Sequence, residues 1–274
     1  FCSYCKIPFA RGKSRSRKKD NIIKETEKLV KEGFKEIILI GINLGAYGED
    51  LDEGENFESL LKAILKVNGL QRVRIGSVYP DKISDEFMDM FKDEKLMPHL
   101  HISLQSCDDE VLERMKRKYG GSLIEERLLK LKEKVKNMEY TADVIVGFPG
   151  ETEKMFQNSY NLIKKIGFSG IHIFQYSDRE NTLASSFTDK IDAKIKKERA
   201  DRLEVLKTEM ALKERKKYIG KHLSVLLEEK IDGYLYGYSE NYLRVKIKDN
   251  GIELNSVIDI KINSLEKEML IADE

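Results

Sequence analysis

The sequence predicts an α/β protein with a parallel sheet, followed by a small antiparallel β-barrel. Between residues 20 and 180, short apolar runs alternate with amphipathic helical stretches, which is typical of chains that build parallel sheets. From residue 222 onward, apolar and polar residues alternate in short segments separated by turn residues, as in small antiparallel barrels. We therefore expect two domains, covering residues 1–219 and 220–274.

The elements of the first domain follow from the period of the apolar residues. Five nearly continuous apolar runs predict strands that are buried on both faces, at residues 36–41, 72–78, 99–105, 141–148 and 171–176. Helical spacing predicts helices between them, at residues 21–31, 57–67, 84–91, 108–118, 123–137 and 152–166. A long charged helix is expected over residues 192–218, because Gly220 supplies a stop.

Composition excludes several classes of protein. The 274 residues include 49 basic and 48 acidic ones, so a globally basic coat for nucleic acid is excluded, although a local patch is not. Three cysteines, an odd number, do not build a disulfide scaffold and predict a reducing, cytoplasmic compartment. No apolar run approaches the ~20 residues of a membrane helix, so we expect no membrane partner.

Polar side chains gather just after the predicted strands. They are Asn43, Ser77, Gln105, Ser106, Gly150, Glu151 and Ser177. The carboxyl ends of parallel strands meet at one edge of the sheet, and parallel barrels build their sites there. This edge is the expected position of the functional site.

Cys2 and Cys5 form a C-x2-C pair at the start of the chain. Two thiolates at this spacing can share a metal ion, because a tight turn brings both sulfurs together. One pair supplies only two ligands, whereas zinc takes four. Taken alone, the pair is therefore compatible with half of a zinc site or with two incidental cysteines.

The residues after the pair resemble a known family. The segment Ile7-Pro8-Phe9-Ala10-Arg11-Gly12 is similar to the cluster-binding loop of radical S-adenosylmethionine methylthiotransferases. Further similar segments follow in the family's order, at residues 39–48, 99–119 and 143–152, and residues 237–242 resemble its terminal TRAM domain. The resemblance implies a partial radical-SAM (β/α) barrel without its first strand, followed by a TRAM-like barrel.

The resemblance also implies the cofactors. In the family, three thiolates hold a 4Fe-4S cluster whose fourth iron binds S-adenosylmethionine, and electron transfer to it yields a 5′-deoxyadenosyl radical. Cys2 and Cys5 would be the second and third ligands. We expect the first ligand upstream of Phe1, together with an N-terminal domain that holds a second cluster. Cys107 is a less favoured substitute ligand.

Eight residues are expected to contact the cofactor, or in some cases the substrate, by the same resemblance: Tyr4, Gly41, Asn43, Gln105, Ser106, Asp143, Ile145 and Gly147. Asp143 lies within an apolar strand and needs a partner, so it is either half of an internal ion pair or an active-site group. His99, His101 and His172 are interpreted as hydrogen-bonded core residues. No catalytic residue is assigned.

A basic segment follows the cysteine pair. Arg11, Lys13, Arg15 and Arg17 are expected to contact RNA phosphates, and the alternative is a solvated loop. The terminal barrel contains more acidic than basic residues, which does not suit an electrostatic clamp. Its tyrosines at positions 234, 236, 238 and 242 could stack on bases, and we expect half of them to face the barrel core.

The resemblance implies a tRNA methylthiotransferase that modifies C2 of N6-threonylcarbamoyladenosine beside the anticodon. Residues 172–182 are most similar to that subfamily, although Gln175 and Asn181 replace its usual Pro and Gly. Methylthiotransferases of isopentenyladenosine in tRNA or of a ribosomal protein are the alternatives. An alternative of another class is a non-catalytic RNA-binding module with zinc on the cysteine pair. Expected partners are tRNA and an electron donor such as flavodoxin or ferredoxin, with a monomeric protein.

Overall fold

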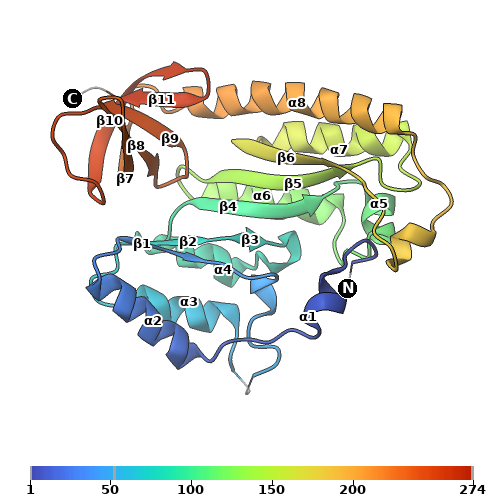
Figure 1. The fold of residues 1–274 in the computed structure, drawn as a ribbon, viewed down its shortest axis with the longest axis horizontal. Helices are drawn as coiled ribbons and strands as arrows, with labels where there is room; N and C mark the ends of the chain where they lie inside the picture. The colour runs from blue at the N-terminus through green and yellow to red at the C-terminus, as the bar shows by residue number, and fades with distance from the viewer. Residues whose placement is uncertain (1, 52–53, 273–274) are drawn as a thin grey trace.

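The computed structural model describes residues 2–51 and 54–272, which form a two-stranded and a four-stranded parallel sheet with helices, and a five-stranded barrel (Figure 1). The two parallel sheets adjoin each other and are together called the sheet below. The strands of the sheet are β1 (Glu36–Leu39), β2 (Arg72–Ile75), β3 (Ser77–Val78), β4 (His99–Gln105), β5 (Glu139–Val146) and β6 (Gly170–Gln175). The helices are α1 (Ile7–Arg11), α2 (Lys19–Lys31), α3 (Phe57–Leu65), α4 (Asp85–Asp89), α5 (Asp109–Arg114), α6 (Gly121–Lys134), α7 (Glu153–Ile166) and α8 (Ala193–Lys216).

The predicted α/β class and the parallel pairing are confirmed. β1 pairs with β2, and β3, β4, β5 and β6 follow side by side, all in parallel. The predicted strand 72–78 is interrupted at Gly76, whose N–H donates to the carbonyl oxygen of Leu39 at 2.9 Å. A Cβ at Gly76 would lie 3.1 Å from that oxygen, so glycine permits this close approach.

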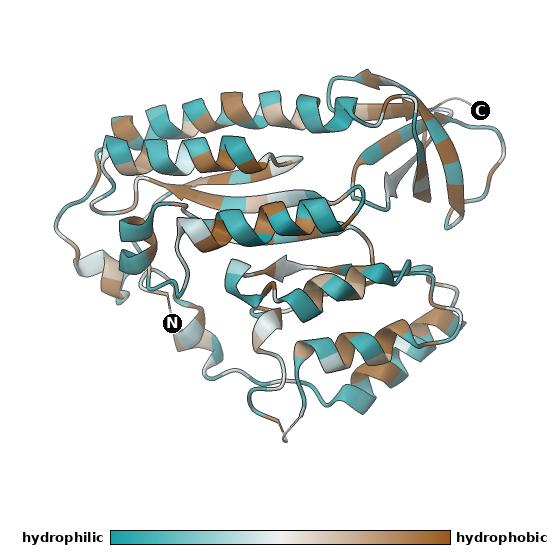
Figure 2. Cartoon of the chain, turned by 180° about the vertical axis from the view of Figure 1, so that it is seen from behind, coloured by the Kyte–Doolittle hydropathy of each residue, from teal (hydrophilic) through white to brown (hydrophobic). Residues whose placement is uncertain are grey.

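Helices cover one face of the sheet, whereas most side chains of β5 on the other face are only half-buried. Figure 2 shows α6 on the near side of the strands, and its residues Ile124, Leu128 and Leu131 are buried in the main core. In β5, Tyr140, Ala142, Val144 and Val146 are buried in the main core, because alternate strand residues point to the same face. The intervening Thr141, Asp143 and Ile145 are only half-buried, and their side of the sheet is called the inner face below.

Local signals explain most helix boundaries. Asn56, Ser84 and Thr152 accept backbone N–H bonds at the starts of α3, α4 and α7, so these helices begin where a capping side chain precedes them. α8 matches the long helix predicted for residues 192–218 to within two residues at each end. Within the described residues, none of the helices is both long and apolar enough to cross a membrane.

The predicted small barrel is confirmed. Its strands are β7 (His222–Ile231), β8 (Tyr234–Ser239), β9 (Arg244–Lys248), β10 (Val257–Glu266) and β11 (Met269–Ala272), and they close in the order β10-β11-β9-β8-β7. Four pairings are antiparallel, but β9 and β11 run parallel, so the barrel is mixed.

The expectation that half of the barrel tyrosines face its core is wrong. Tyr234, Tyr236 and Tyr238 are two residues apart and therefore share one face of β8, while Leu235 and Gly237 fill the inside. On the outer face Lys246 lies 4.0 Å from the centre of the Tyr234 ring, and Arg244 lies over the rings of Tyr236 and Tyr238.

The barrel is attached to the amino edge of the sheet through two buried arginines. Arg74 forms a two-pronged ion pair with Glu36, at 2.9 and 3.0 Å, and its guanidinium also donates to the carbonyl oxygens of Ser239 and Glu240 in the barrel. Arg72 reaches Glu36 at 3.4 Å. Because Arg72 and Arg74 are only 2% and 3% exposed, Glu36 neutralises two charges that water cannot reach.

We predict that Glu36→Gln destabilises the protein by about 3 kcal/mol, because it leaves two buried guanidinium groups without a carboxylate. Urea unfolding should show this loss. The control Glu86→Gln removes an exposed ion pair with Lys62 and should change the unfolding free energy by less than ~1 kcal/mol. Equal effects of the two substitutions would contradict the role given to Glu36.

Glu139 lies at the same junction between the barrel and the sheet. Its burial predicts that the free energy of unfolding depends on pH. Its carboxylate accepts a hydrogen bond from the Tyr218 hydroxyl at 2.8 Å, and burial, followed by the charge of Glu214, raises the pKa of Glu139 to about 7 from 4.5. Between these two values the folded protein binds more protons than the unfolded chain. The free energy of unfolding should therefore fall as pH rises from about 4.5 to 7.

Glu139→Gln should remove this fall, which amounts to at most about 3 kcal/mol. Urea unfolding at several pH values between 4 and 8 measures it, with the exposed Glu133→Gln as control. If the curves of the wild type and Glu139→Gln run parallel over this range, Glu139 does not titrate as described.

Candidate functional site

The turn that carries the cysteine pair is fixed at the carboxyl edge of the sheet. Ser3 donates its N–H to the carbonyl oxygen of Met115 at 3.1 Å and its hydroxyl to that of Arg114 at 2.7 Å, both at the end of α5. The Ser3 carbonyl accepts the N–H of Ala184 at 2.8 Å, in the connection that follows β6. The turn is therefore anchored to two strand–helix connections that are distant in the sequence.

Tyr4 packs into this edge between the two cysteines. Its ring meets Phe148 edge to face at 6.1 Å, and its hydroxyl accepts a hydrogen bond from Arg117 at 2.7 Å. Arg117 lies 4.7 Å over the ring of Tyr79, which follows β3. Burial raises the pKa of Tyr4, so its phenol stays protonated. The predicted cofactor contact thus forms part of a rigid aromatic wall.

The cysteine pair fits part of a cluster site. Cys2 and Cys5 are half-exposed free thiols, and the backbone N–H of Ile7 lies 3.4 Å from the Cys5 sulfur. Hydrogen bonds to sulfur tune iron–sulfur sites. Among residues 2–51 and 54–272, however, no three Cys, His, Asp or Glu side chains gather as metal ligands. The two thiolates fit two of the three positions, and a third must come from elsewhere.

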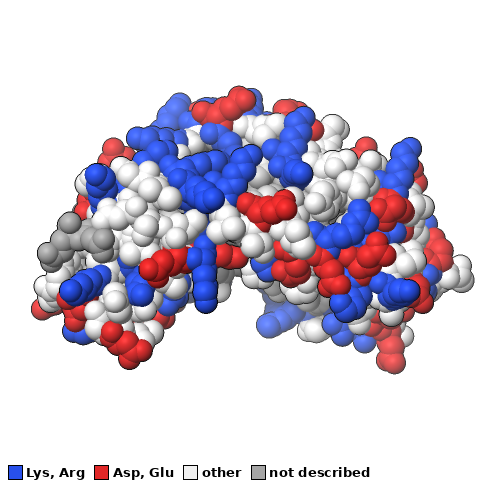
Figure 3. Space-filling view, turned by 90° about the horizontal axis from the view of Figure 1, so that it is seen from above, with Lys and Arg blue, Asp and Glu red and all other residues white. Residues whose placement is uncertain are grey.

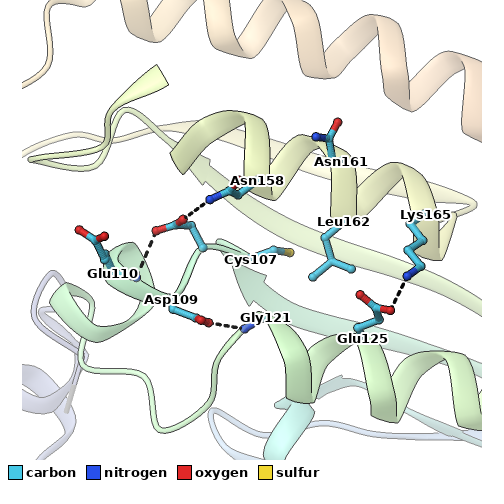
Figure 4. Close-up of a pocket in the computed structure, with 10 residues that line it drawn as sticks. Cys107, Asp109, Glu110, Gly121, Glu125, Asn158, Asn161, Leu162 and Lys165 are labelled. Atoms are coloured by element: carbon cyan, nitrogen blue, oxygen red, sulfur yellow. Dashed lines mark hydrogen bonds and ion pairs between the residues drawn. The ribbon is translucent and has the colours of Figure 1, made fainter. Parts of the chain in front are cut away.

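Cys107 does not supply that thiolate. It is 4% exposed, and burial raises the pKa of its thiol to about 12. Its backbone N–H donates to the Ser159 hydroxyl on α7, and its side chain lines a shallow polar pocket between α5, α6 and α7 (Figure 4). This pocket lies on the helix-covered face, so the interpretation of Cys107 as a substitute ligand is unsupported.

Two predicted cofactor contacts lie in a loop that leaves the carboxyl edge, and a third is the last residue of a strand there. Gly41 and Asn43 follow β1, and a Cβ at Gly41 would lie 2.9 Å from a methyl carbon of Leu44. Gln105 ends β4 with a φ of 66°, a left-handed conformation that is uncommon for glutamine. Strained backbone of this kind clusters at functional sites.

Ser106 and Gly147 have structural partners instead. The Ser106 hydroxyl lies 3.0 Å from that of Ser159 and is turned toward α7, away from the inner face. Gly147 has a φ of 70°, and a Cβ there would lie 2.3 Å from Lys196 of α8. Both positions shape the edge, but their surroundings do not favour the predicted contact with a cofactor.

Asp143 and Ile145 lie on the inner face of β5. The Asp143 carboxylate meets His101 Nε2 at 3.2 Å, so the predicted partner is an imidazole on the neighbouring strand. β5 ends at Val146, which places Asp143 about 10 Å below the edge. His99 and His101 are hydrogen-bonded as expected, but His172 is exposed. The alternation of side chains along each strand was the sequence signal that could have placed His101, Asp143 and His172 on one face of the sheet.

The basic segment crosses the outside of the same edge. Arg11, Lys13, Arg15 and Arg17 are all solvent-exposed or nearly so. Ser16 ties the segment down, because it donates its N–H to Asp50 at 2.8 Å and accepts the N–H of Gly48. Arg17 is already paired with Glu25 at 2.6 Å. Within the described part of the chain, Lys13 and Arg15 form no ion pair and can accept anions.

A second cluster of basic side chains lies at the ends of helices, away from this site. Figure 3 shows Lys and Arg side chains over the end of α8, beside the barrel. The last turns of α6, α7 and α8 all carry basic residues, which complement the negative ends of helix dipoles. In Figure 1, α8 lies on the opposite side of the sheet from the basic segment after α1.

The chain is similar to known proteins over most of its length. It is 39% identical over 269 residues to a threonylcarbamoyladenosine tRNA methylthiotransferase of Bacillus subtilis, covering 96% of this chain and 59% of that protein. It is 36% identical over 271 residues to a tRNA-2-methylthio-N(6)-dimethylallyladenosine synthase of Clostridium botulinum, covering 96% and 60%. The chain thus spans about three fifths of the length of these relatives.

Fold and sequence lead to the same family. The structure superimposes on coproporphyrinogen III oxidase of Escherichia coli, a radical SAM enzyme, with a TM-score of 0.57 and 13% identity, covering 88% of this chain and 64% of that one. A sequence profile of the radical SAM superfamily matches residues 1–163, which contain the cysteine pair and strands β1 to β5. The chain therefore belongs to the radical SAM superfamily.

Proposed function

We propose that this chain is the catalytic part of a radical SAM tRNA methylthiotransferase that modifies N6-threonylcarbamoyladenosine. The observation that carries the proposal is the position of the cysteine turn, held by Ser3 and Tyr4 at the carboxyl edge of a superfamily sheet. The relative from Bacillus subtilis has this named activity and matches nearly the whole chain. When bound, the cluster and S-adenosylmethionine supply a carbon radical that abstracts hydrogen.

The residues of this chain would bind and orient the two small-molecule groups. Cys2 and Cys5 would hold two irons of the 4Fe-4S cluster, and we propose a cysteine upstream of Phe1 as the third ligand. Tyr4, Gln105, Ile145 and the loop containing Gly41 and Asn43 would surround S-adenosylmethionine. A second cluster in an upstream domain, and reduction by a flavodoxin or ferredoxin, complete the proposal.

RNA would contact the protein on two surfaces, one beside the cysteine turn and one on the barrel. Lys13 and Arg15 offer unpaired charges to phosphates beside the cysteine turn. The outward tyrosines of β8, backed by Arg244 and Lys246, offer rings on which bases can stack although the barrel is acidic. These surfaces support the proposal of an RNA substrate, acted on by a monomeric cytoplasmic protein.

The cysteine assignment predicts a selective loss of iron. Cys2→Ser and Cys5→Ser, in the protein expressed with its upstream sequence and reconstituted without oxygen, should lose the site's iron and all formation of 5′-deoxyadenosine. Cys107→Ser should keep both, because that thiol is buried behind the sheet. Iron, sulfide and zinc content measure the outcome, and stoichiometric zinc without sulfide would favour the RNA-binding module instead.

The substrate assignment is tested by offering the reconstituted protein three substrates with reductant and S-adenosylmethionine. We expect a methylthio group on tRNA that carries N6-threonylcarbamoyladenosine. Dimethylallyl- or isopentenyl-modified tRNA and the ribosomal protein should react at least tenfold more slowly. Nucleoside mass spectrometry detects the RNA products, and peptide mass spectrometry detects the protein product. Preferential reaction of either alternative would reassign the subfamily, for which the similarity to the Clostridium enzyme provides a second candidate.

A further inference from the structure

Three titratable side chains lie together on the inner face of the sheet, below the cysteine turn. They are His101 of β4, Asp143 of β5 and His172 of β6, and the two imidazole rings meet edge to face at 5.6 Å. The side chains of His101 and Asp143 are 19% and 29% exposed, and His172 is exposed. The group therefore faces open space rather than the helix-covered core.

Hydrogen bonds fix the direction in which this group presents its atoms. With its proton on Nε2, the His101 ring donates to the Asp143 carboxylate and accepts at Nδ1 from the Thr141 hydroxyl, 2.9 Å away. The Thr141 oxygen in turn accepts from His99 Nε2 at 3.1 Å, and burial keeps His99 neutral by lowering its pKa. The chain of bonds holds His101 and Asp143 in a single arrangement.

One oxygen of Asp143 and both ring nitrogens of His172 remain open. Within the described residues, neither Asp143 Oδ1 nor the His172 nitrogens form a hydrogen bond or an ion pair. Because His172 lies directly opposite Asp143 in the β5–β6 register, these atoms form an adjacent acceptor and donor. A ligand that matches them offers a donor beside an acceptor.

The walls around the pair are apolar and suit a flat ring. Phe174 follows His172 on the same face of β6 and is 50% exposed, and Ile145 lies opposite Phe174. Exposed apolar side chains around a few oriented polar atoms are typical of a small-ligand site.

We propose that Asp143 and His172 bind the adenine base of the substrate through its N6–H and N7 edge. This inference rests on the function proposed above. Adenine presents a donor at N6 beside an acceptor at N7, whereas guanine presents two acceptors there, one of which would face the carboxylate. The six-membered ring places C2 opposite the C5 atom that carries N7, so this edge leaves C2 directed away from the pair, toward the cysteine turn.

The distance between Asp143 and the carboxyl edge of the sheet agrees with this orientation of the base. Asp143 lies about 10 Å below the carboxyl edge, where the cofactor would bind. A base bound through its N6–H and N7 edge would occupy the space between Asp143 and the carboxyl edge, with its C2 atom nearest the cofactor. Asp143, which the sequence assigned to the cofactor, thus becomes a substrate-binding residue, and His101 becomes the positioning residue that holds its carboxylate.

The test measures the Kd of the cluster-loaded, full-length protein for an anticodon stem–loop RNA. One RNA carries N6-threonylcarbamoyladenosine, and the other carries its 7-deaza analogue, which lacks only the N7 acceptor. For the wild type, we expect the analogue to bind about five- to tenfold more weakly, the effect of one hydrogen bond. His172→Phe should bind both RNAs equally, at the weaker level.

Two further variants keep the result interpretable. His222→Phe removes an exposed histidine that is paired with Asp259 on the barrel, and it should retain the full sensitivity to N7. Asp143→Asn, which keeps the size of the side chain, should bind both RNAs more weakly than the wild type. A wild type that binds the two RNAs equally, or a His172→Phe protein that still distinguishes them, would overturn the inference alone. If the wild type binds neither RNA, the proposed function fails with it.

Discussion

The ion pairs of Glu36 with Arg72 and Arg74 hold the two parts of the molecule together. These three residues lie at the start of β1 and in β2, and the arginines extend into the barrel to bond its backbone carbonyl groups. Docking in this way places Tyr242 against His99, with ring centres 4.8 Å apart, and Arg74 over the Tyr242 ring. The barrel therefore closes the amino end of the inner face. This contact depends on the Glu36 carboxylate, because that group neutralises the two buried arginines.

The opposite end of the same face is closed by a different kind of contact. The cysteine turn is held there by backbone hydrogen bonds of Ser3 and by the aromatic packing of Tyr4 against Phe148. Between the two ends, the strands display His101, Asp143 and His172, which the helices do not cover.

Several features of the site followed from residue patterns. The strands were predictable because their runs are mostly apolar, although β1, β5 and β6 are not buried on both faces as expected. The helices were predictable because their apolar residues recur at helical spacing. The resemblance of the segment after Cys5 to a cluster-binding loop indicated the superfamily before any fold was known. Capping side chains such as Thr152 fixed helix ends locally, which is why those boundaries agreed so closely.

Other features were beyond such patterns. Ser106 and Gly147 follow the right strands, yet their side-chain directions depend on how α7 and α8 pack against the sheet. By contrast, the shared outward face of the β8 tyrosines follows from their spacing of two and could have been predicted. His101 and His172 are far apart in the sequence, and only the register between β4, β5 and β6 brings them to Asp143.

The sequence by itself determined the order of elements, the superfamily and the two thiolates, because these depend on local periodicity and on motifs contiguous in the chain. Only the tertiary structure decided that Cys107 lies behind the sheet, that Glu36 joins the barrel to the sheet, and that Asp143 pairs with His101 on the inner face. The physical reason is that these contacts join residues from different strands and helices, and their geometry is set by packing and register, which no single segment specifies.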